Sequence, residues 1–442
     1  MLIPVINTTD EQVSLKKGCT LGEITDIENT EGLMWAEPEQ NNPDDSKVSH
    51  LYNLGHIKQG RVEIENILNK YHSVTSRGDY DVGECKLDPM HIDTGNRGPV
   101  YVPPRRMSPI VRQELSQHID EWQKNRIITT SNSSWSFPLV AVRKKDGTCR
   151  PCADLREINK ITRYEAHPLP NLDDSLKSLK GSRFFTSLDL NKGFMQMFLD
   201  EESSNKCSFP FAGTLYRFLR VPFGLKSAPG WFQLQMNTVL AGFTPEQLLV
   251  YLDDFLLHTP DLESHLILLD KVLARLQSYG LKIRPSKCEI LKTEVEYLGH
   301  RISEEGISPL AASVDKIKNY PRPGTCKQVR RLVGLANWYR EYVRDFSTLI
   351  RPLTQCMSKS SFKWTDQCED AFQKVKNLFS SEDVLAYPDY QSENPLILTC
   401  DASASGVGGY LSQYQNNRER IISYYLKCFN EAHVITVLLI KN

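Results

Sequence analysis

Two adjacent aspartates, Asp253 and Asp254, stand between two apolar runs, residues 248–250 and 255–257. Neighbouring carboxylates repel each other, and apolar flanks raise the cost of keeping both of them ionised. A bound cation would offset this repulsion, whereas a turn open to solvent would relieve it without any metal. A third acid, Asp189, ends the apolar residues 184–188. We predict that Asp189, Asp253 and Asp254 meet around one point, with the solvated turn as the alternative.

Three carboxylates at one point would favour a hard divalent cation, Mg²⁺ or Mn²⁺, because these ions prefer oxygen ligands and share them with phosphate groups. Two such ions, roughly 3.5–4 Å apart, stabilise both the attacking and the leaving oxygen of a phosphoryl transfer. The chemistry that the aspartates indicate is therefore metal-dependent phosphoryl transfer.

The elements that must position these acids follow from apolar periodicity. Residues 183–190 read as a strand that ends in Asp189, and residues 248–258 as a strand, a turn and a second strand. Residues 262–279 predict an amphipathic helix that Gly280 ends, and residues 228–240 a shorter one. Ser108 and Pro109 begin a helix over residues 108–125, before a strand at 137–142. This order predicts an α+β sheet with helices on one face.

Further helices are expected at residues 310–319, 327–343 and 366–379, followed by a hairpin of residues 396–401 and 406–414. Aromatic side chains are interleaved with the basic residues of these helices, which are Lys316, Lys318, Lys327, Arg330, Arg331, Arg340 and Arg344. A surface that holds nucleic acid and a merely solvated basic face are equally good interpretations of this pattern.

Charge is distributed unevenly along the 442 residues. Residues 1–99 hold 17 acidic and 9 basic side chains, whereas residues 100–442 hold 37 and 44. A basic body suits a phosphate-rich partner, because neutralised phosphates release condensed counterions. No apolar run reaches about 18 residues, so we expect no membrane span. The eleven cysteines are scattered, which favours a reducing, intracellular protein with free thiols.

Several motifs, in this order, resemble those of reverse transcriptases. Tyr251-Leu252-Asp253-Asp254 matches the Y-x-D-D box. The accompanying segments are KKDGTCRPCADLREIN at 144–159, SLDLNKGFMQ at 187–196, VPFGLKSAPGWF at 221–232, KC at 287–288 and YLGH at 297–300. Over roughly residues 88–433 the chain is most similar to the Pol polyprotein of gypsy-type retrotransposons with long terminal repeats.

The resemblance implies an α+β right-hand polymerase. Its fingers and palm would span residues 91–308, and its helical thumb 309–385. A partial RNase H-like α/β domain would follow at 386–442, and residues 1–90 would be a poorly structured linker from the upstream polyprotein. The implied activity is RNA-directed DNA polymerisation, in which deoxynucleoside triphosphates are added to a DNA primer on an RNA template. Asp189, Asp253 and Asp254 would hold the Mg²⁺ or Mn²⁺ ions.

The same resemblance implies roles for other residues. Those that bind the incoming nucleotide would be Lys145, Arg150, Phe194, Phe223 and Gly224. Phe194 would exclude a ribose 2′-hydroxyl by steric clash. The primer grip would be Leu298, Gly299 and His300. Without the resemblance, core packing is the better explanation of Phe194 and Phe223.

Three further interpretations concern function. Asp401 matches the first carboxylate of an RNase H site, but residues 434–442 stand where the family has its glutamate-bearing helix, so we expect no RNase H activity. The competing function for the whole chain is a catalytically inactive retrotransposon remnant that binds nucleic acid. The Asp93-Thr94-Gly95 triplet of aspartic proteases also occurs, although no β-rich domain is expected around it.

Overall fold

The computed structural model describes residues 47–143, 147, 149–164, 167–243, 245–358, 362–378, 384–403 and 406–428. The chain divides into two units, residues 1–45 and 46–442, and every described residue belongs to the second. None of the helices within these ranges has both the length and the apolar composition that crossing a bilayer requires.

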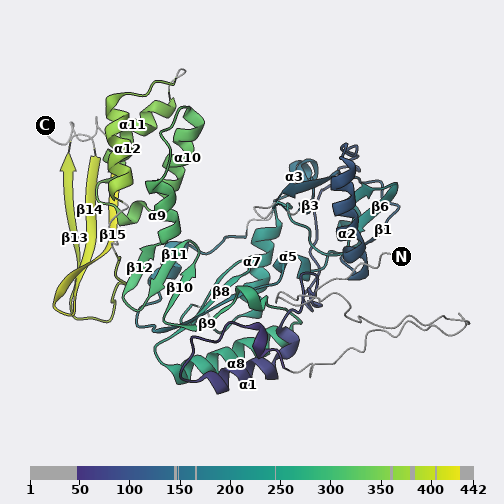
Figure 1. The fold of residues 1–442 in the computed structure, drawn as a ribbon, viewed down its shortest axis with the longest axis horizontal. Helices are drawn as coiled ribbons and strands as arrows, with labels where there is room; N and C mark the ends of the chain where they lie inside the picture. The colour runs from purple at the N-terminus through teal and green to yellow at the C-terminus, as the bar shows by residue number, and fades with distance from the viewer. Residues whose placement is uncertain are drawn as a thin grey trace, which may run out of the picture. The chain divides into compact units, whose positions relative to one another are not determined.

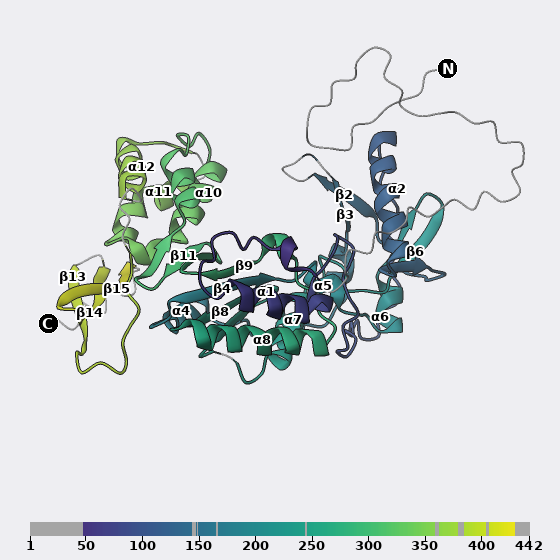
Figure 2. The ribbon, with the colours of Figure 1, turned by 60° about the horizontal axis from the view of Figure 1, so that its bottom comes forward.

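The central sheet is antiparallel, with the strand order β7-β8-β4-β9. Its strands are β4 (Phe184–Asp189), β7 (Leu248–Tyr251), β8 (Asp254–Thr259) and β9 (Glu289–Lys292). Two helices contact its strands, α7 (Ala228–Val239) at β7 and α8 (Leu262–Ser278) at β8, and α1 (Arg61–Lys70) packs against α8. Figures 1 and 2 both show α1 beside α8. The expected strand at 183–190 and the strand–turn–strand at 248–258 are confirmed.

Helix α8 forms where the apolar spacing predicts it. Its buried residues recur every three or four positions and are His265, Leu268, Leu269, Val272, Leu273 and Leu276. The Asp261 carboxylate caps its first turn by accepting a hydrogen bond from the Ser264 N–H at 2.8 Å. Beyond the helix, Gly280 has a φ of +69°, and a Cβ there would lie 2.2 Å from the Glu84 carbonyl oxygen. Glycine thus ends the helix and lets the upstream chain pass close by.

The part expected to form the fingers contains a sheet of order β1-β6-β5 and the hairpin β2-β3. Its strands are β1 (Ile128–Thr130), β2 (Leu139–Arg143), β3 (Cys149–Ala153), β5 (Ser208–Phe211) and β6 (Thr214–Phe218). Its helices are α2 (Pro109–Lys124), α3 (Arg156–Ile161) and α6 (Glu201–Lys206). Ser108 caps α2 and Pro109 begins it, as predicted. Two short helices, α4 (Leu172–Lys177) and α5 (Gly193–Gln196), flank β4 in the chain.

The part expected to form the thumb follows a sheet of order β10-β11-β12, with strands β10 (Glu294–Tyr297), β11 (His300–Ser303) and β12 (Gly306–Pro309). Its helices are α9 (Ala311–Lys318), α10 (Cys326–Asn337), α11 (Phe346–Ser358) and α12 (Asp366–Leu378). The single helix expected at 327–343 is wrong in its second half: α10 ends at Asn337, and a 3₁₀ turn, η4 (Arg340–Tyr342), follows. Helix α11 had not been expected.

A three-stranded antiparallel sheet follows, of order β13-β14-β15, with β13 (Leu396–Ser403), β14 (Gly406–Gln415) and β15 (Arg418–Cys428). The predicted hairpin of β13 and β14 is confirmed. Strands β14 and β15 are joined through Asn416 and Asn417, whose φ angles of +52° and +60° suit a tight hairpin turn. The Ala386 N–H donates to the Ile421 carbonyl at 2.7 Å, which ties this sheet to the preceding segment.

Residues 47–90 pack more closely than the sequence led us to expect. They contain η1 (Ser49–Leu51), α1 and η2 (His72–Val74), and their buried side chains join the main core. Lys70 pairs with Asp270 at 2.7 Å, and His56 bonds the Ile290 carbonyl at 2.9 Å. These partners lie 200 or more positions further along the chain, so the local sequence could not predict these contacts.

Candidate active site

The turn that carries Asp253 and Asp254 joins β7 to β8, where Tyr251 pairs with Asp254. Leu252 in this turn has a φ of +55°, a left-handed conformation that costs a branched residue roughly 1–3 kcal/mol. Buried Gln233 of α7 holds the turn on both sides. Its Oε1 accepts from the Leu252 N–H at 2.7 Å, and its Nε2 donates to the Val250 carbonyl at 3.1 Å.

Asp189 is brought to the same place by strand pairing. It is the register partner of Asp254 across β4 and β8, so their Cα atoms are about 5 Å apart. The Leu190 N–H donates to the Asp253 carbonyl at 3.1 Å, which ties the third acid to the end of β4. The structure thus gathers the three aspartates, as the apolar runs predicted.

The three carboxylates perturb one another. Burial is the main cause that raises the pKa of Asp253, and Asp189 adds to the rise. Burial also raises the pKa of Asp254 to about 6, helped by repulsion from Asp253 and Asp189 and opposed by Lys287. A site that holds ionised carboxylates against this repulsion favours a cation.

Lys287 is a cation that directly contacts one of the three acids. It ends the 3₁₀ turn η3 (Pro285–Lys287), and its Nζ lies 2.8 Å from the Asp189 Oδ2. Among the described residues no group of three or more acidic, histidine or cysteine side chains is already arranged to hold a metal ion. The donor set nevertheless fits a divalent ion, because Asp189, Asp253 and Asp254 supply carboxylate oxygens at a partly buried point.

A cavity of about 300 Å³ opens beside the aspartates and is lined by Asp189, Asp253, Arg150 and Phe223, among others. The Arg150 guanidinium lies 5.8 Å from the centre of the Phe223 ring. Phe194 meets Phe223 edge-on, with ring centres 5.8 Å apart. Arg150, Phe194 and Phe223 are therefore brought together next to the acids.

Two glycines allow this close assembly. A Cβ on Gly193 would lie 3.0 Å from the Phe232 ring and 3.1 Å from the Asp253 Cβ, so the start of α5 can approach the turn only without a side chain. Gly224 has a φ of +104°, and its carbonyl accepts from the Asn159 side chain at 2.7 Å. Lys145, the other expected nucleotide contact, lies outside the described residues.

The expected primer grip forms the turn between β10 and β11. Leu298 and Gly299 have φ angles of +48° and +87°. His300 is buried and turned toward the thumb, where its Nδ1 bonds the Tyr342 hydroxyl at 2.9 Å and its ring stacks on Trp338. The Tyr297 hydroxyl donates to the Asp254 carbonyl at 3.3 Å. The turn is thus linked both to the thumb and to β8, the strand that begins with Asp254.

Other predicted residues stand apart from this cluster. Asp401 is exposed on β13 opposite Gly408, and within the described ranges no acidic cluster surrounds it. Asp93 pairs with Arg163 at 3.3 Å. Sequence reasoning missed Gln233, and it gave Tyr297 and Lys287 no role.

Comparisons with known proteins agree with this geometry. Residues 142–302 match the family described as reverse transcriptase (RNA-dependent DNA polymerase). Residues 364–436 match the RNase H-like domain found in reverse transcriptase. A solved structure of a foamy viral protease-reverse transcriptase in complex with dsDNA superposes with a TM-score of 0.79 at 25% identity, covering 90% of this chain and 84% of that one. The right-hand polymerase fold followed by an RNase H-like domain is thereby confirmed.

Two Drosophila melanogaster relatives extend the match over most of the chain. The Pol polyprotein from transposon 297 is 33% identical over 370 residues, 82% of this chain and 35% of that protein. The Pol polyprotein from transposon gypsy is 33% identical over 341 residues, 73% of this chain and 33% of that protein. The chain thus spans about a third of the length of these relatives. It belongs to the reverse transcriptase family, in the form carried by the Pol polyproteins of gypsy-type retrotransposons.

Proposed function

We propose that this chain is an RNA-directed DNA polymerase that extends a primer 3′ end by metal-dependent nucleotidyl transfer. The observation that carries the proposal is the register of β4 against β8, which sets Asp189 opposite Asp254 at the edge of a basic cavity. A phosphoryl-transfer site requires clustered carboxylates that bind metal ions despite their mutual repulsion, and next to them a space for a triphosphate.

Asp189, Asp253 and Asp254 would hold one or two Mg²⁺ or Mn²⁺ ions. When bound, such ions stabilise negative charge on the primer 3′ oxygen and on the triphosphate. Lys287 would give up part of its contact with Asp189 as the ions bind, because both compete for the same carboxylate oxygen. Gln233 keeps the turn in place during this exchange, since its two hydrogen bonds to the turn reach the backbone of Val250 and Leu252.

The nucleotide would lie in the cavity beside the acids. Arg150 reaches this space from β3 and would pair with the triphosphate, because a guanidinium matches phosphate oxygens with two hydrogen bonds. Phe194 is wedged between Phe223 and Phe232, with ring centres 5.8 and 4.9 Å away. A ring fixed in this way would exclude a sugar 2′-hydroxyl, and Phe223 and Gly224 would line the base and template side.

The template and primer would lie along the palm and thumb as an RNA/DNA hybrid or a DNA duplex. Thumb side chains that reach solvent include Lys327, Arg330, Arg331 and Arg340, together with Trp338, which is 52% exposed. Cations spaced along one helix and its following turn suit a phosphate backbone, and an exposed indole suits a sugar or base face. The turn of Leu298, Gly299 and His300 would hold the primer end near Asp254.

Primer extension on an RNA template with Mg²⁺ tests the proposal. The wild-type chain should extend the primer with deoxynucleotides, and Asp253→Asn should abolish extension while hybrid binding persists. Asp315→Asn, on the exposed side of α9, is the matched control and should behave as wild type. Binding of the hybrid without any extension by the wild-type chain would point instead to an inactive remnant.

Loss of RNase H activity is part of the proposal. Its support is the position of Asp401, which is exposed and pairs across the sheet with a glycine, not with another acid. Among the described residues no group of acids that could hold a metal ion surrounds Asp401, and one carboxylate alone cannot hold the cations that hybrid cleavage needs. Degradation of the RNA strand of a hybrid by the purified chain, abolished by Asp401→Asn, would contradict this.

A further inference from the structure

Three distant parts of the chain meet beside Asp189. Just beyond β4, the Arg284 N–H donates to the Asp189 carbonyl at 2.8 Å, and the Asn191 N–H donates to the Lys282 carbonyl at 3.0 Å. On its other edge the same stretch binds the upstream chain, because the Ser76 N–H donates to the Ile283 carbonyl at 2.9 Å. Residues 282–284 therefore lie beside the end of β4, and residues 74–76 lie beside residues 282–284, each held by backbone hydrogen bonds.

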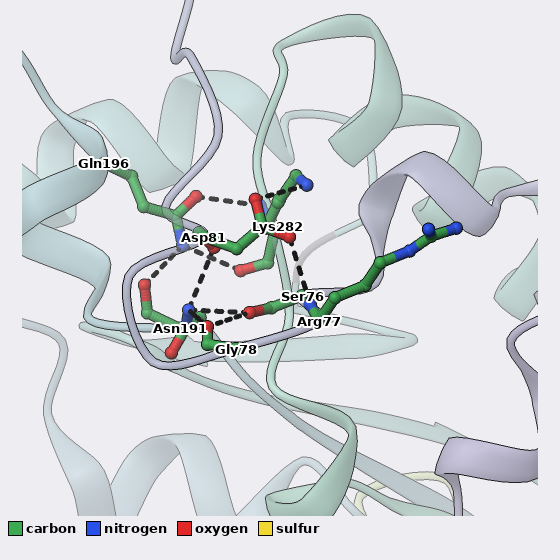
Figure 3. Close-up of polar contacts among 7 residues, drawn as sticks. All are labelled: Ser76, Arg77, Gly78, Asp81, Asn191, Gln196 and Lys282. Atoms are coloured by element: carbon green, nitrogen blue, oxygen red, sulfur yellow. Dashed lines mark hydrogen bonds and ion pairs between the residues drawn. The ribbon is translucent and has the colours of Figure 1, made fainter. Parts of the chain in front are cut away.

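Asn191 connects this assembly to the upstream loop, which we define as residues 76–81. The side chain of Asn191 is only 1% exposed. Its Nδ2 lies 2.7 Å from the Ser76 Oγ, 3.0 Å from the Gly78 carbonyl and 2.9 Å from the Asp81 carbonyl (Figure 3). Two of these acceptors are carbonyls, so only the amide NH₂ group can satisfy them.

Gln196 and Lys282 close the network from the other side (Figure 3). The Nε2 of fully buried Gln196 donates to the Asn191 carbonyl at 3.0 Å and to the Lys282 carbonyl at 2.7 Å, and its Oε1 accepts from the Lys282 N–H at 2.8 Å. The Lys282 ammonium pairs with Asp81 at 2.5 Å, and the other Asp81 oxygen accepts from the Arg77 N–H at 3.0 Å. The stretch after β4, residues 282–284 and the upstream loop are thus each hydrogen-bonded to the other two.

The upstream loop also reaches the site itself. Asp79 pairs with Arg284 at 3.0 Å, and the Lys192 ammonium lies 3.8 Å from the centre of the Tyr80 ring. Asp79 and Tyr80 line the same cavity as Asp189 and Asp253. The loop is therefore a wall of the site as well as a support for it.

We propose that the upstream loop belongs to the support of the catalytic centre and that Asn191 is a positioning residue for Asp189. The inference rests on the polymerase function proposed above. Asn191 stands two residues after Asp189, and both backbones are bonded to the same stretch, residues 282–284. Releasing the Asn191 side chain would let the end of β4 shift, and catalytic groups must be held within about 0.5 Å to work.

The test compares three alanine variants of the full-length chain. Asn191→Ala removes the donor at the centre of the network, and Ser76→Ala removes one of its three acceptors. Gln277→Ala is the matched control, because it deletes a 2.7 Å hydrogen bond from α8 to Ser73, on the same upstream segment but away from Asp189. Mn²⁺ affinity is measured by titration calorimetry without substrate. Primer extension gives kcat and KM, and thermal unfolding gives Tm.

Asn191→Ala should weaken Mn²⁺ binding and lower kcat, each by about tenfold or more, with little change in the nucleotide KM, because a shift of about 1 Å in a catalytic group costs up to a hundredfold. Ser76→Ala should lower Mn²⁺ affinity and kcat by a smaller factor. Gln277→Ala should change neither the Mn²⁺ affinity nor kcat. A folded Asn191→Ala variant with wild-type Mn²⁺ affinity and kcat would overturn the inference. If that variant does not fold, unchanged values in Ser76→Ala overturn it. A wild-type chain that extends no primer refutes the polymerase, while Mn²⁺ binding still tests Asn191.

Discussion

The clearest consequence of the aspartate cluster is that, without a cation, it should destabilise the protein at neutral pH. Burial and like-charge repulsion raise the pKa of Asp254 from 3.8 to about 6. A rise of this size corresponds to at most about 3 kcal/mol, since each pKa unit is 1.36 kcal/mol and solvent screens part of the repulsion at this partly exposed group. Because the folded state binds this proton more tightly than the unfolded state, stability is full below about pH 4 and falls as pH rises through about 6.

Asp254→Asn removes the ionising group and keeps the shape of the side chain. In EDTA at pH 7–8 the variant should be more stable than wild type by up to about 3 kcal/mol, and the two should converge near pH 4. The assay is urea unfolding across this pH range, with Asp315→Asn, on an exposed face of α9, as the control. Millimolar Mg²⁺ should stabilise the wild type selectively, because a ligand that binds only the folded state adds RT ln(1 + c/Kd) to the free energy of unfolding, where c is the free ligand concentration.

Parallel stability curves for wild type and Asp254→Asn from pH 4 to pH 8 would refute the reasoning. They would mean that Asp254 is freely solvated and feels neither Asp189 nor Asp253. The alternative of a solvated turn, which the sequence left open, would then be the better description.

Three other predictions concern neighbouring groups. Gln233→Leu leaves the Leu252 N–H and the Val250 carbonyl without a partner; we expect a loss of about 1–3 kcal/mol in urea unfolding and a lower kcat in primer extension. Phe194→Ala opens the space beside Phe223, so ribonucleotide incorporation should rise relative to deoxynucleotide incorporation in single-turnover kinetics, and an unchanged ratio would count against its role. Tyr342→Phe removes the 2.9 Å hydrogen bond at His300; the Kd for primer–template should weaken several-fold while the nucleotide KM stays constant.

Much of the fold could be predicted because its signals are local. Helix α8 follows from the spacing of its apolar residues and from Gly280, and the aspartate hairpin from two apolar runs around two acids. Helix α11 could not be predicted in this way, because Pro352 lies inside it and proline normally signals a helix end. Its apolar face against α10 and α12 supplies the stability that the local sequence lacks.

In the candidate site, too, some residues could be predicted from the local sequence and others could not. Residues whose chemistry is unusual in their own segment were found, above all Asp189, Asp253 and Asp254. Gln233, Asn191 and Lys287 were not given roles, because a polar side chain in a helix or loop has no local mark that shows which distant backbone it binds. Gln233 reaches the turn from 17 and 19 positions away, and Asn191 reaches the upstream loop from more than 100.

The structure is least favourable, in local terms, where the chemistry is expected. Two adjacent acids face a third, and Leu252 adopts a left-handed backbone. Each feature costs free energy, and each is held by a buried amide side chain that binds main-chain atoms: Gln233 behind the turn and Asn191 beyond Asp189. Amides suit this task, because they form hydrogen bonds without adding charge to a site that already carries an excess of it. Substituting a carboxylate for either amide should therefore lower the free energy of unfolding and kcat more than substituting an apolar side chain. The carboxylate adds repulsion and also removes a hydrogen-bond donor.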